Sequence, residues 1–441
     1  MAIFTTRPRL WFLTLLCPLW LQGQQSSSST YTFSSWAGFT GSEGSVDGVG
    51  SLARFRSPSG VAVDASGNIF VADRGNHTIR RISTDRVVTT FAGLAFVDGG
   101  GAGSTDGTGA AARFRAPSDV AADGSGNIYV SDTENYTIRK ITSDGLVSTF
   151  AGKAGSNGVN DGTGNAARFQ WPSGLAVDGA GNVYVADPVS HTIRKITPVG
   201  VVSTFAGSAF ASGSVDGKGS AARFKSPSHV AVDTSGNVYV SDGSRTIRKI
   251  SPDGVVSTLA GKAFELGSAD GTGSTARFSR PSGIACDQLG NLYVSDSDNH
   301  TIRKVTSEGI VTTVAGKAPS DGGGSGSLDG GGSAARFVSP RGLVIDNLGN
   351  IYVADFGNYT IRRGSGVMPP SVLPPSLGAD GKLGFEVIAS AGQQVIVETT
   401  TDLSAWAESQ RVTGQGAATP VRVNVVFQDD VTARFWRVRR P

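Results

Sequence analysis

The chain has 441 residues, of which 61 are glycine and only 17% are charged. Glycine is therefore about twice as frequent as in an average globular protein, and charge is well below the usual ~25%. Nothing after residue 24 approaches the ~20 apolar residues of a spanning helix, which excludes a membrane transporter. Glycine does not recur at every third position, which excludes collagen. The recurring blocks of Val, Ile, Phe and Ala argue against disorder, so we expect the surplus glycine in turns between many short strands.

The first 24 residues are typical of a secretory signal peptide. Arg7 and Arg9 precede a short apolar stretch at residues 10–21, and a polar Gln-Gly-Gln segment follows. We therefore predict a signal peptide at residues 1–24 and export to the periplasm, the cell surface or the medium. Its removal leaves Cys286 as the single cysteine, so no internal disulfide is expected. It also lowers the formal charge from +3 to +1, a poor match to nucleic acid, and we expect neither a nucleic-acid partner nor a membrane span.

A repeat of 54 to 59 residues runs through most of the chain. The tripeptide Ala-Arg-Phe occurs six times and ends at Phe55, Phe114, Phe169, Phe224, Phe278 and Phe337. Each copy continues with a proline, an apolar run ending in Asp, a Gly-Asn pair and a second apolar run ending in Asp. Thr-Ile-Arg follows, and most copies close with an apolar run ending in Ala-Gly. Repeats of this length are the signature of an array of supersecondary units.

The composition of each unit predicts four antiparallel strands. Four apolar runs of four to six residues alternate with Gly, Asn and Asp, and no stretch shows the 3.6-residue period of a helix. Asp-x-x-Gly-Asn suits the first hairpin, because Gly and Asn tolerate positive φ. A four-stranded sheet repeated radially is a β-propeller, here all-β and six-bladed.

The two ends of the array predict how the ring closes. The sixth unit lacks its last strand, because Gly364 and a Pro-rich stretch follow Thr-Ile-Arg. The segment 30–38, which ends in Trp-Ala-Gly, matches the missing strand and precedes the first Ala-Arg-Phe. An N-terminal strand would therefore complete the sixth blade and remove the open edges of the ring. We expect a closed propeller over residues 30–365.

The repeat resembles the NHL repeat. The resemblance rests on the pattern Pro-x-Gly, apolar run, Asp-x-x-Gly-Asn-(Ile/Val)-Tyr-Val-(Ala/Ser)-Asp-x-x-Asn-(His/Tyr)-x-Ile-Arg-Lys, of which six copies cover about three quarters of the chain. It implies a six-bladed propeller, here similar to secreted bacterial members. It implies little about activity, because NHL propellers include protein- and RNA-binding modules, a peptide-amidating lyase and exported proteins of unknown role.

The C-terminal part is predicted to be a separate unit. Residues 366–376 are rich in proline and read as a semi-rigid linker. Residues 377–441 contain four strand-like runs, at 383–388, 394–399, 421–426 and 434–438. We expect a small β-sandwich-like domain of ~65 residues, near the lower limit for independent folding.

Two residues interrupt the repeat where the innermost strand of a blade is expected. Asp119 and His229 replace the Gly that follows Pro-Ser in other units. Both side chains could reach the mouth of the central channel, where they would form an acid/base pair or hold a metal. The other histidines, His77, His191 and His300, share one repeat position with tyrosines and are interpreted as turn or packing residues.

The remaining registered residues favour structural roles. The Asp that ends the first apolar run, such as Asp64, is present in every unit, as expected of a turn-forming Asx residue. The arginines of Ala-Arg-Phe are expected to pair with acids or to cap backbone groups at blade junctions, and each Phe to pack between sheets. Resemblance to amidating lyases and gluconolactonase-like propellers implies metal held by channel carboxylates, amides or His, but no matching cluster stands out. We therefore predict no catalytic residue, no metal ligand and no cofactor.

The loops that follow Ala-Gly differ most between units. Phe39, Phe96, Phe210 and Phe264 lie in them, and these rings either project from one face to contact a protein or glycan, or pack against the ring. Trp171 stands where other units have Ser, Ala or Arg and is a further candidate contact residue.

Uniform repeats without a catalytic interruption favour an exported, non-catalytic propeller. We expect it to bind a protein or glycan through the loops of one face. The alternative is a metal-dependent hydrolase or lyase, gluconolactonase-like or amidating-lyase-like, acting at the channel through Asp119 and His229. A third possibility is a purely structural envelope or adhesion component.

Overall fold

A computed structural model describes residues 31–95 and 101–366 with their side chains, together with the backbone of seven short strands between residues 371 and 439. The predicted signal peptide, most of the predicted linker and Phe96 lie outside the described residues. Within the described part, no helix has the length and apolar composition needed to traverse a bilayer, and Cys286 is a free thiol.

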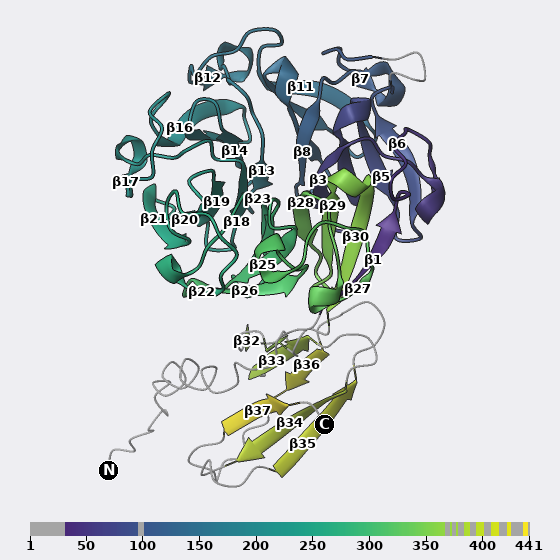
Figure 1. Cartoon of the computed structure of the whole chain (residues 1–441), viewed down its shortest axis with the longest axis vertical. Helices are drawn as coiled ribbons and strands as arrows, with labels where there is room; N and C mark the ends of the chain where they lie inside the picture. Colours follow the sequence, from purple (N-terminus) through teal and green to yellow (C-terminus); the bar gives the residue numbers. More distant parts are fainter. Residues whose placement is uncertain are drawn as a thin grey trace, which may run out of the picture.

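The described chain before residue 367 forms six antiparallel sheets, which confirms the six-bladed propeller (Figure 1). We number the blades in the order of the Ala-Arg-Phe motifs and give their strands from the outer edge to the axis. Blade 1 contains β2 (Gly48–Val49), β6 (Val87–Ala92), β5 (Thr78–Ile82), β4 (Ile69–Asp73) and β3 (Pro58–Val63). Blade 2 contains β7 (Gly107–Thr108), β11 (Leu146–Gly152), β10 (Thr137–Ile141), β9 (Ile128–Asp132) and β8 (Pro117–Ala122). Blade 3 contains β12 (Gly162–Thr163), β16 (Val201–Gly207), β15 (Thr192–Ile196), β14 (Val183–Asp187) and β13 (Leu175–Val177).

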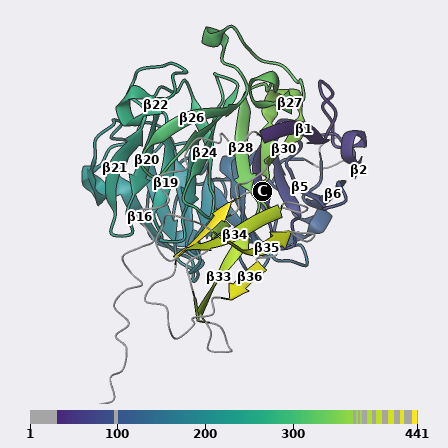
Figure 2. The same ribbon diagram turned by 90° about the horizontal axis from the view of Figure 1, so that it is seen from below.

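The other three blades repeat this order. Blade 4 contains β17 (Gly217–Lys218), β21 (Val255–Ala260), β20 (Thr246–Ile250), β19 (Val238–Asp242) and β18 (His229–Val232). Blade 5 contains β22 (Gly271–Thr272), β26 (Ile310–Ala315), β25 (Thr301–Val305), β24 (Leu292–Asp296) and β23 (Pro281–Cys286). Blade 6 contains β27 (Gly330–Gly331), β1 (Tyr31–Ala37), β30 (Thr360–Gly366), β29 (Ile351–Asp355) and β28 (Pro340–Ile345). Seen from below, β21, β20 and β19 run from the rim inward (Figure 2).

Each blade has five strands, so the expectation of four was wrong by one. The additional strand has two residues and comes from the Asp-Gly-x-Gly segment, which pairs with the outer edge of its own blade. A short 3₁₀ turn follows each of these outer strands: η2 (Gly50–Leu52), η5 (Gly109–Ala111), η7 (Gly164–Ala166), η8 (Gly219–Ala221), η9 (Gly273–Thr275) and η11 (Gly332–Ala334). Four other 3₁₀ turns are η3 (Arg74–Asn76), η6 (Thr133–Asn135), η10 (Pro319–Asp321) and η12 (Phe356–Asn358).

The N-terminal strand β1 closes the ring, as predicted. It pairs antiparallel with β30 from Tyr31 opposite Gly366 to Ala37 opposite Ile361, and with β27 on its other side (Figure 1). Phe33 is fully buried and meets the Phe337 ring edge-to-face at 5.1 Å between centroids. A Cβ at Gly364 would lie 2.5 Å from the Phe33 ring, so this ring packs directly on the β30 backbone. Closure of the ring therefore depends on the packing of Phe33 as well as on the pairing of β1 with β30 and β27.

The core consists of apolar clusters shared between neighbouring blades. Phe55 of blade 1 is fully buried among Ala37, Tyr352 and Ile361 of blade 6 as well as the strands of its own blade. Phe114 occupies the corresponding place between blades 1 and 2. The expectation that each Ala-Arg-Phe ring packs between adjacent sheets is therefore confirmed at these junctions.

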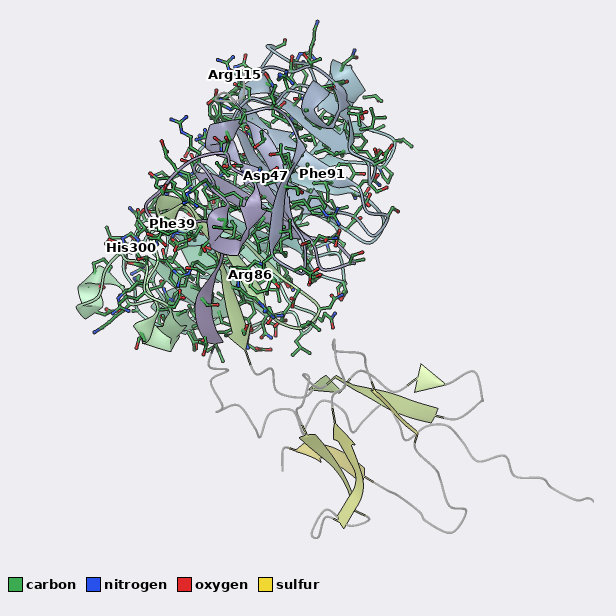
Figure 3. All side chains as sticks on the ribbon, turned by 90° about the vertical axis from the view of Figure 1, so that its right-hand side faces the viewer. Phe39, Asp47, Arg86, Phe91, Arg115 and His300 are labelled. Atoms are coloured by element: carbon green, nitrogen blue, oxygen red, sulfur yellow. The ribbon has the colours of Figure 1, made fainter. Side chains whose placement is uncertain are left out.

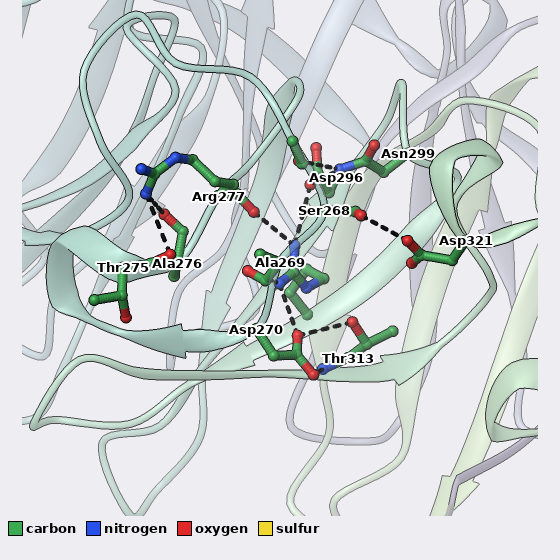
Figure 4. Close-up of polar contacts among 12 residues, drawn as sticks. Ser268, Ala269, Asp270, Thr275, Ala276, Arg277, Asp296, Asn299, Thr313 and Asp321 are labelled. Atoms are coloured by element: carbon green, nitrogen blue, oxygen red, sulfur yellow. Dashed lines mark hydrogen bonds and ion pairs between the residues drawn. The ribbon is translucent and has the colours of Figure 1, made fainter.

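The middle strand of every blade carries a fully buried arginine. These are the arginines of Thr-Ile-Arg: Arg80, Arg139, Arg194, Arg248, Arg303 and Arg362. In blade 5, Arg303 donates to the Asp270 carboxylate at 2.8 Å and reaches Asp296 at 3.4 Å. Figure 4 labels both of these aspartates. It also donates to the backbone oxygens of Ala269 and Arg277, at 3.1 and 3.0 Å. One side chain thus connects two loops and the end of strand β24 to strand β25.

The two arginine sets have different partners, and the expected capping of backbone groups by the Ala-Arg-Phe arginines is confirmed. The Thr-Ile-Arg arginines pair with the acids of the Asp-Gly segments. The arginines of Ala-Arg-Phe instead cap backbone carbonyls. Arg54, for example, donates to Ser51 O at 2.8 Å and to Ala53 O at 2.9 Å. The expected turn role of the Asp64 position is confirmed, because Asp64 accepts from the backbone N–H of Ser66 and Asn68, both at 2.9 Å.

The C-terminal strands are β31 (Ser371–Val372), β32 (Ser376–Leu377), β33 (Leu383–Ile388), β34 (Gln394–Thr400), β35 (Ala407–Thr413), β36 (Val421–Asn424) and β37 (Phe435–Arg439). Strand β33 pairs with β31, β32 and β36, and β34 pairs with β35 and β37. The sandwich-like arrangement of residues 377–441 stays a prediction.

Phe33→Ala is expected to lower the free energy of unfolding by about 3–5 kcal/mol, because it empties the packed space between β1 and β30. Urea unfolding followed by tryptophan fluorescence measures this change. Thr32→Ala, at the exposed neighbouring position, is the matched control and should change stability by less than ~0.5 kcal/mol. Equal stability of both variants would contradict closure by β1.

Arg303→Met is expected to cost about 3–5 kcal/mol, because it leaves the fully buried carboxylate of Asp296 without its counter-ion. Thermal and urea unfolding of the variant measure the loss. Arg115→Met, at a side chain that is 56% exposed, removes the same charge and should be nearly neutral. A similar loss of stability in both variants would show that burial and pairing of Arg303 contribute no more to the free energy of unfolding than an exposed charge does.

Candidate functional site

The loops that leave each Ala-Gly sequence emerge on the face where the inner strands begin. In blade 1 the register places Pro58 opposite Asp73, Asp73 opposite Thr78, and Ile79 opposite Ala92. The starts of inner strands, the β4–β5 turn and the loop after Ala92 therefore share one edge of the blade. We call the corresponding side of the ring the loop face. Figure 3 views the ring from the side and labels Phe39, Arg115 and His300 along this face.

Four of the six residues at one level of the central axis are glycine. The inner strands pack against one another around the axis, and the position after Pro-Ser is Gly60, Gly174 or Gly283 in blades 1, 3 and 5. A Cβ at Gly174 would lie 2.3 Å from the Cα of His229, and one at Gly283 would lie 2.2 Å from the oxygen of Arg341. The strands approach so closely here that four of the six blades carry glycine, with Gly342 as the fourth.

Asp119 and His229 occupy the other two positions of this level, and the structure brings them together. His229 Nε2 lies 2.9 Å from Asp119 Oδ2, although blade 3 stands between their blades. The contact passes over Gly174, whose missing side chain leaves the space. Asp119 Oδ2 also accepts a hydrogen bond of 2.7 Å from the Leu175 backbone N–H of blade 3. The pair thus joins three consecutive blades at the axis.

Both nitrogens of the His229 ring face oxygen atoms. Nδ1 lies 3.1 Å from the backbone oxygen of Val230, and Nε2 faces Asp119. Burial disfavours the charged imidazolium, but the nearby Asp119 carboxylate and the Val230 oxygen outweigh it and raise the pKa of His229. When the ring is protonated, both nitrogens carry a proton and no lone pair is left for a metal or a substrate proton. The contact therefore suits an ion pair that joins blades, and acid/base work would require the ring to be released first.

Metal donors do not converge elsewhere in the part of the chain that the structure describes, where no group of three or more His, Cys, Asp or Glu side chains is placed to hold an ion. The three repeat-position histidines have structural roles, as expected. Each has a left-handed φ of 56–61° and accepts through Nδ1 a hydrogen bond from a backbone N–H of the next blade, at 3.0–3.1 Å.

A pocket of about 430 Å³ opens on the loop face over blades 3 to 5. Its wall contains Trp171, Ser226 and Arg280, which occupy the same repeat position in three successive blades. Further lining residues are Ser173, Pro188, Ser228, Gly243, Arg245, Ser279, Pro281, Ser282 and Asp298. Ser173, Ser228 and Ser282 directly precede the residues of the glycine level, so the pocket lies at the mouth of the axis above His229.

The pocket combines one large ring with polar and charged groups. Trp171 is partly buried, and its ring meets Tyr136 edge-to-face at 6.5 Å between centroids, which steadies it. Arg280 reaches Asp298 only at 3.7 Å, and both side chains are more than half exposed. The Arg245 Nε is buried without a hydrogen-bond partner. Such a lining offers donors and acceptors for a polar ligand beside an aromatic surface.

Of the remaining predicted contact residues, Phe210 and Phe264 are 59% and 53% exposed. The sequence left open whether these rings project from the face or pack against the propeller, and at these two positions they project. Phe264 adjoins the pocket, because Arg245 donates to its backbone oxygen at 3.4 Å and Lys225 lies 5.2 Å above its ring. The lining itself includes neither phenylalanine.

Sequence reasoning missed Arg245, Arg280 and Asp298. Arg280 was visible as a departure at the Trp171 position, and Arg245 as the residue of a shortened turn in blade 4. Neither departure could be placed at a common pocket before the order and spacing of the blades around the axis were known.

The NHL repeat family model matches residues 55–82, 114–141, 169–196, 278–305 and 337–363. The chain belongs to the NHL-repeat β-propeller family. These matches leave out blade 4, where three residues instead of four separate Asp242 from Thr246. This NHL propeller is 31% identical over 348 residues to NHL repeat-containing protein 2 of Homo sapiens, covering 69% of this chain and 46% of that protein. It is 29% identical over 333 residues to Protein SUPPRESSOR OF QUENCHING 1, chloroplastic, of Arabidopsis thaliana, covering 74% of this chain and 26% of that protein. The chain thus spans less than half the length of these relatives.

Solved propellers share the fold at low sequence identity. A structural genomics protein of unknown function from Bacteroides thetaiotaomicron superposes with a TM-score of 0.59 at 21% identity, covering 77% of this chain and 76% of that one. An auxiliary nutrient binding protein from the same organism superposes with a TM-score of 0.58 at 16% identity, covering 77% of each chain. These likenesses show the propeller fold of this NHL-repeat chain.

The His229 contact predicts a pH-dependent stability. Because its folded-state pKa is raised, the contact stabilises the protein fully below the unfolded pKa of about 6.5 and loses this effect as pH rises through the folded pKa. His229→Gly, which restores the residue of four other blades, should therefore cost more stability at pH 5.5 than at pH 9. Urea unfolding at both pH values measures the difference.

Proton NMR titration provides the control for this prediction. His229 should titrate above 6.5, whereas burial lowers the pKa of His77 and His300, which should titrate below it. Asp119→Gly should bring the His229 midpoint down. A His229 midpoint at or below 6.5 in the unaltered protein would contradict the ion pair.

Proposed function

We propose that this NHL propeller is an exported binding protein that takes a glycan in the pocket on its loop face. The observation that carries the proposal is the pocket of about 430 Å³ with Trp171 in its wall. This volume lies in the usual range for small-molecule sites, ~300–1,000 Å³. Export rests on the sequence of residues 1–24.

The lining suits a carbohydrate better than an apolar ligand. An aromatic ring packs against the C–H face of a sugar ring, while hydroxyl and guanidinium groups exchange hydrogen bonds with sugar hydroxyls. The pocket supplies Trp171 for the first contact and Ser226, Ser228, Arg245 and Arg280 for the second. The exposed rings of Phe210 and Phe264 extend the same face and could contact a longer chain.

A binding role also agrees with the similar fold of the auxiliary nutrient binding protein from Bacteroides thetaiotaomicron. Protein binding through the loop-face phenylalanines is the alternative, and the combination of Trp171 with hydroxyl and guanidinium groups in one pocket favours the glycan. The hydrolase or lyase alternative would use Asp119 and His229, and it stays a prediction because both ring nitrogens of His229 already face oxygens.

Trp171→Ala is expected to weaken glycan binding by about tenfold or more, because stacking on the ring is lost. A glycan array identifies a bound oligosaccharide, and isothermal titration calorimetry with that oligosaccharide measures its affinity for both proteins. Phe39→Ala, at a 50% exposed ring between blades 6 and 1, is the control and should leave the affinity unchanged. An array without any bound glycan, or equal affinities of Trp171→Ala and the unaltered protein, would overturn the proposal.

A further inference from the structure

Blade 6 departs from the other blades at a single inner position on the loop face. Arg341 stands where the others carry serine: Ser59, Ser118, Ser173, Ser228 and Ser282. Its guanidinium carbon lies 3.5 Å from the centroid of the Phe356 ring, and Phe356 begins the turn η12 on the same face. Stacking occupies the flat surface of a guanidinium and leaves its N–H groups, which lie in the plane, for hydrogen bonds.

Arg341 has no anionic partner among the residues that the structure describes. It differs in this from the arginines of Thr-Ile-Arg, each of which pairs with at least one aspartate. It is nevertheless partly buried, so its charge is only incompletely hydrated. An arginine in this situation gains most from a ligand that brings the missing negative charge.

The surroundings of Arg341 are themselves positive. Burial, followed by the charges of Arg280 and Arg74, lowers the pKa of Arg341 to about 10, so the side chain stays charged at neutral pH. The two neighbours are only loosely neutralised, since Arg280 reaches Asp298 at 3.7 Å and Arg74 reaches Glu134 at 3.8 Å. Glu134 is shared with Arg115 at 3.3 Å. Arg280, Arg74 and Arg115 therefore share two carboxylates, and Arg341 adds a further positive charge beside Arg280 and Arg74.

We propose that Arg341, assisted by Arg280 and Arg74, binds an oxyanion, the carboxylate or phosphate group of a small ligand, at the blade 6 side of the channel mouth. The planar fork of Arg341, held by Phe356, matches two oxygens of such a group. Arg280 also lines the pocket over blades 3 to 5, whereas Arg341 does not, so the anion site adjoins the pocket without coinciding with it.

Calorimetric titration of the full-length protein tests this site. Inorganic phosphate and sodium glucuronate are titrated separately at constant ionic strength, because screening would otherwise change any cationic surface. At least one of the two should bind. Binding of phosphate alone assigns the site to a phosphoryl group, binding of glucuronate alone assigns it to a carboxylate, and binding of both assigns it to oxyanions in general.

The decisive variant is Arg341→Ser, which introduces the residue found in the other five blades. It should weaken anion binding by about tenfold or more, and Arg280→Ser should weaken it to a smaller extent. Lys218→Ser removes the same charge from a side chain that is 66% exposed in strand β17 and should have no effect. Thermal unfolding confirms that the variants are folded.

The outcomes separate this site from the glycan pocket. Trp171→Ala should leave anion binding unchanged. The glycan proposal and the anion proposal can therefore be contradicted independently of each other. Absence of binding by both probes, unchanged binding in Arg341→Ser, or an equal loss in Lys218→Ser would each overturn the proposal.

Discussion

The propeller depends on one interaction that recurs in every blade, the buried arginine of Thr-Ile-Arg. It is fully enclosed, it pairs with the aspartate of the outer Asp-Gly segment, and it lies 5.1–5.3 Å from the centroid of the Ala-Arg-Phe ring. A buried guanidinium is costly unless it is paired and hydrogen-bonded, so the loops that supply carboxylate and carbonyl oxygens to its two Nη groups are held in place around it, while its Nε has no hydrogen-bond partner. The same side chain thereby connects the edge of a blade to the junction with its neighbour.

Blade 3 varies this arrangement. Arg194 pairs with Asp161, whereas Asp187 accepts the backbone N–H groups of Gln170 and Trp171.

This repeated frame explains why function can reside in a few substitutions near the axis. The inner strands lie so close together that four of the six residues at one level are glycine, and a side chain there must find space over a neighbouring glycine. Asp119 and His229 do so by meeting across Gly174. Arg341 lies one residue before this level, and Trp171 and Arg280 lie three residues before it, on the loop side of the ring. The structure thus separates positions that hold the ring together from positions that can vary with the ligand.

Much of the fold was predictable because the constraints that define it are local and repeated six times. Turn residues, strand length and the incomplete sixth unit predicted the blades and the closing strand β1 without any knowledge of distances. The two-residue outer strand escaped prediction, because Gly48–Val49 has no strand-like composition and pairs only when β6 is already in place. The capping role of the Ala-Arg-Phe arginines was predicted, but the pairing of the Thr-Ile-Arg arginines was not, because Arg54 and Arg80 are both regular in sequence. Only burial distinguishes the one that needs a carboxylate from the one that caps carbonyls.

The sequence by itself determined the family, the number of blades, the way in which the ring closes and the residues at which the repeat is interrupted. Periodicity carries this information, since each unit must bury the same face against identical neighbours. The tertiary structure decided which interruptions meet. Asp119 and His229 are 110 residues apart and belong to blades that are not adjacent, and their contact exists because the axis brings all six inner strands within reach of one another. Trp171 and Arg280 share a pocket, and Arg341 lies unpaired beside it, for the same reason. In a closed ring, residues that are far apart along the chain lie around the same channel mouth.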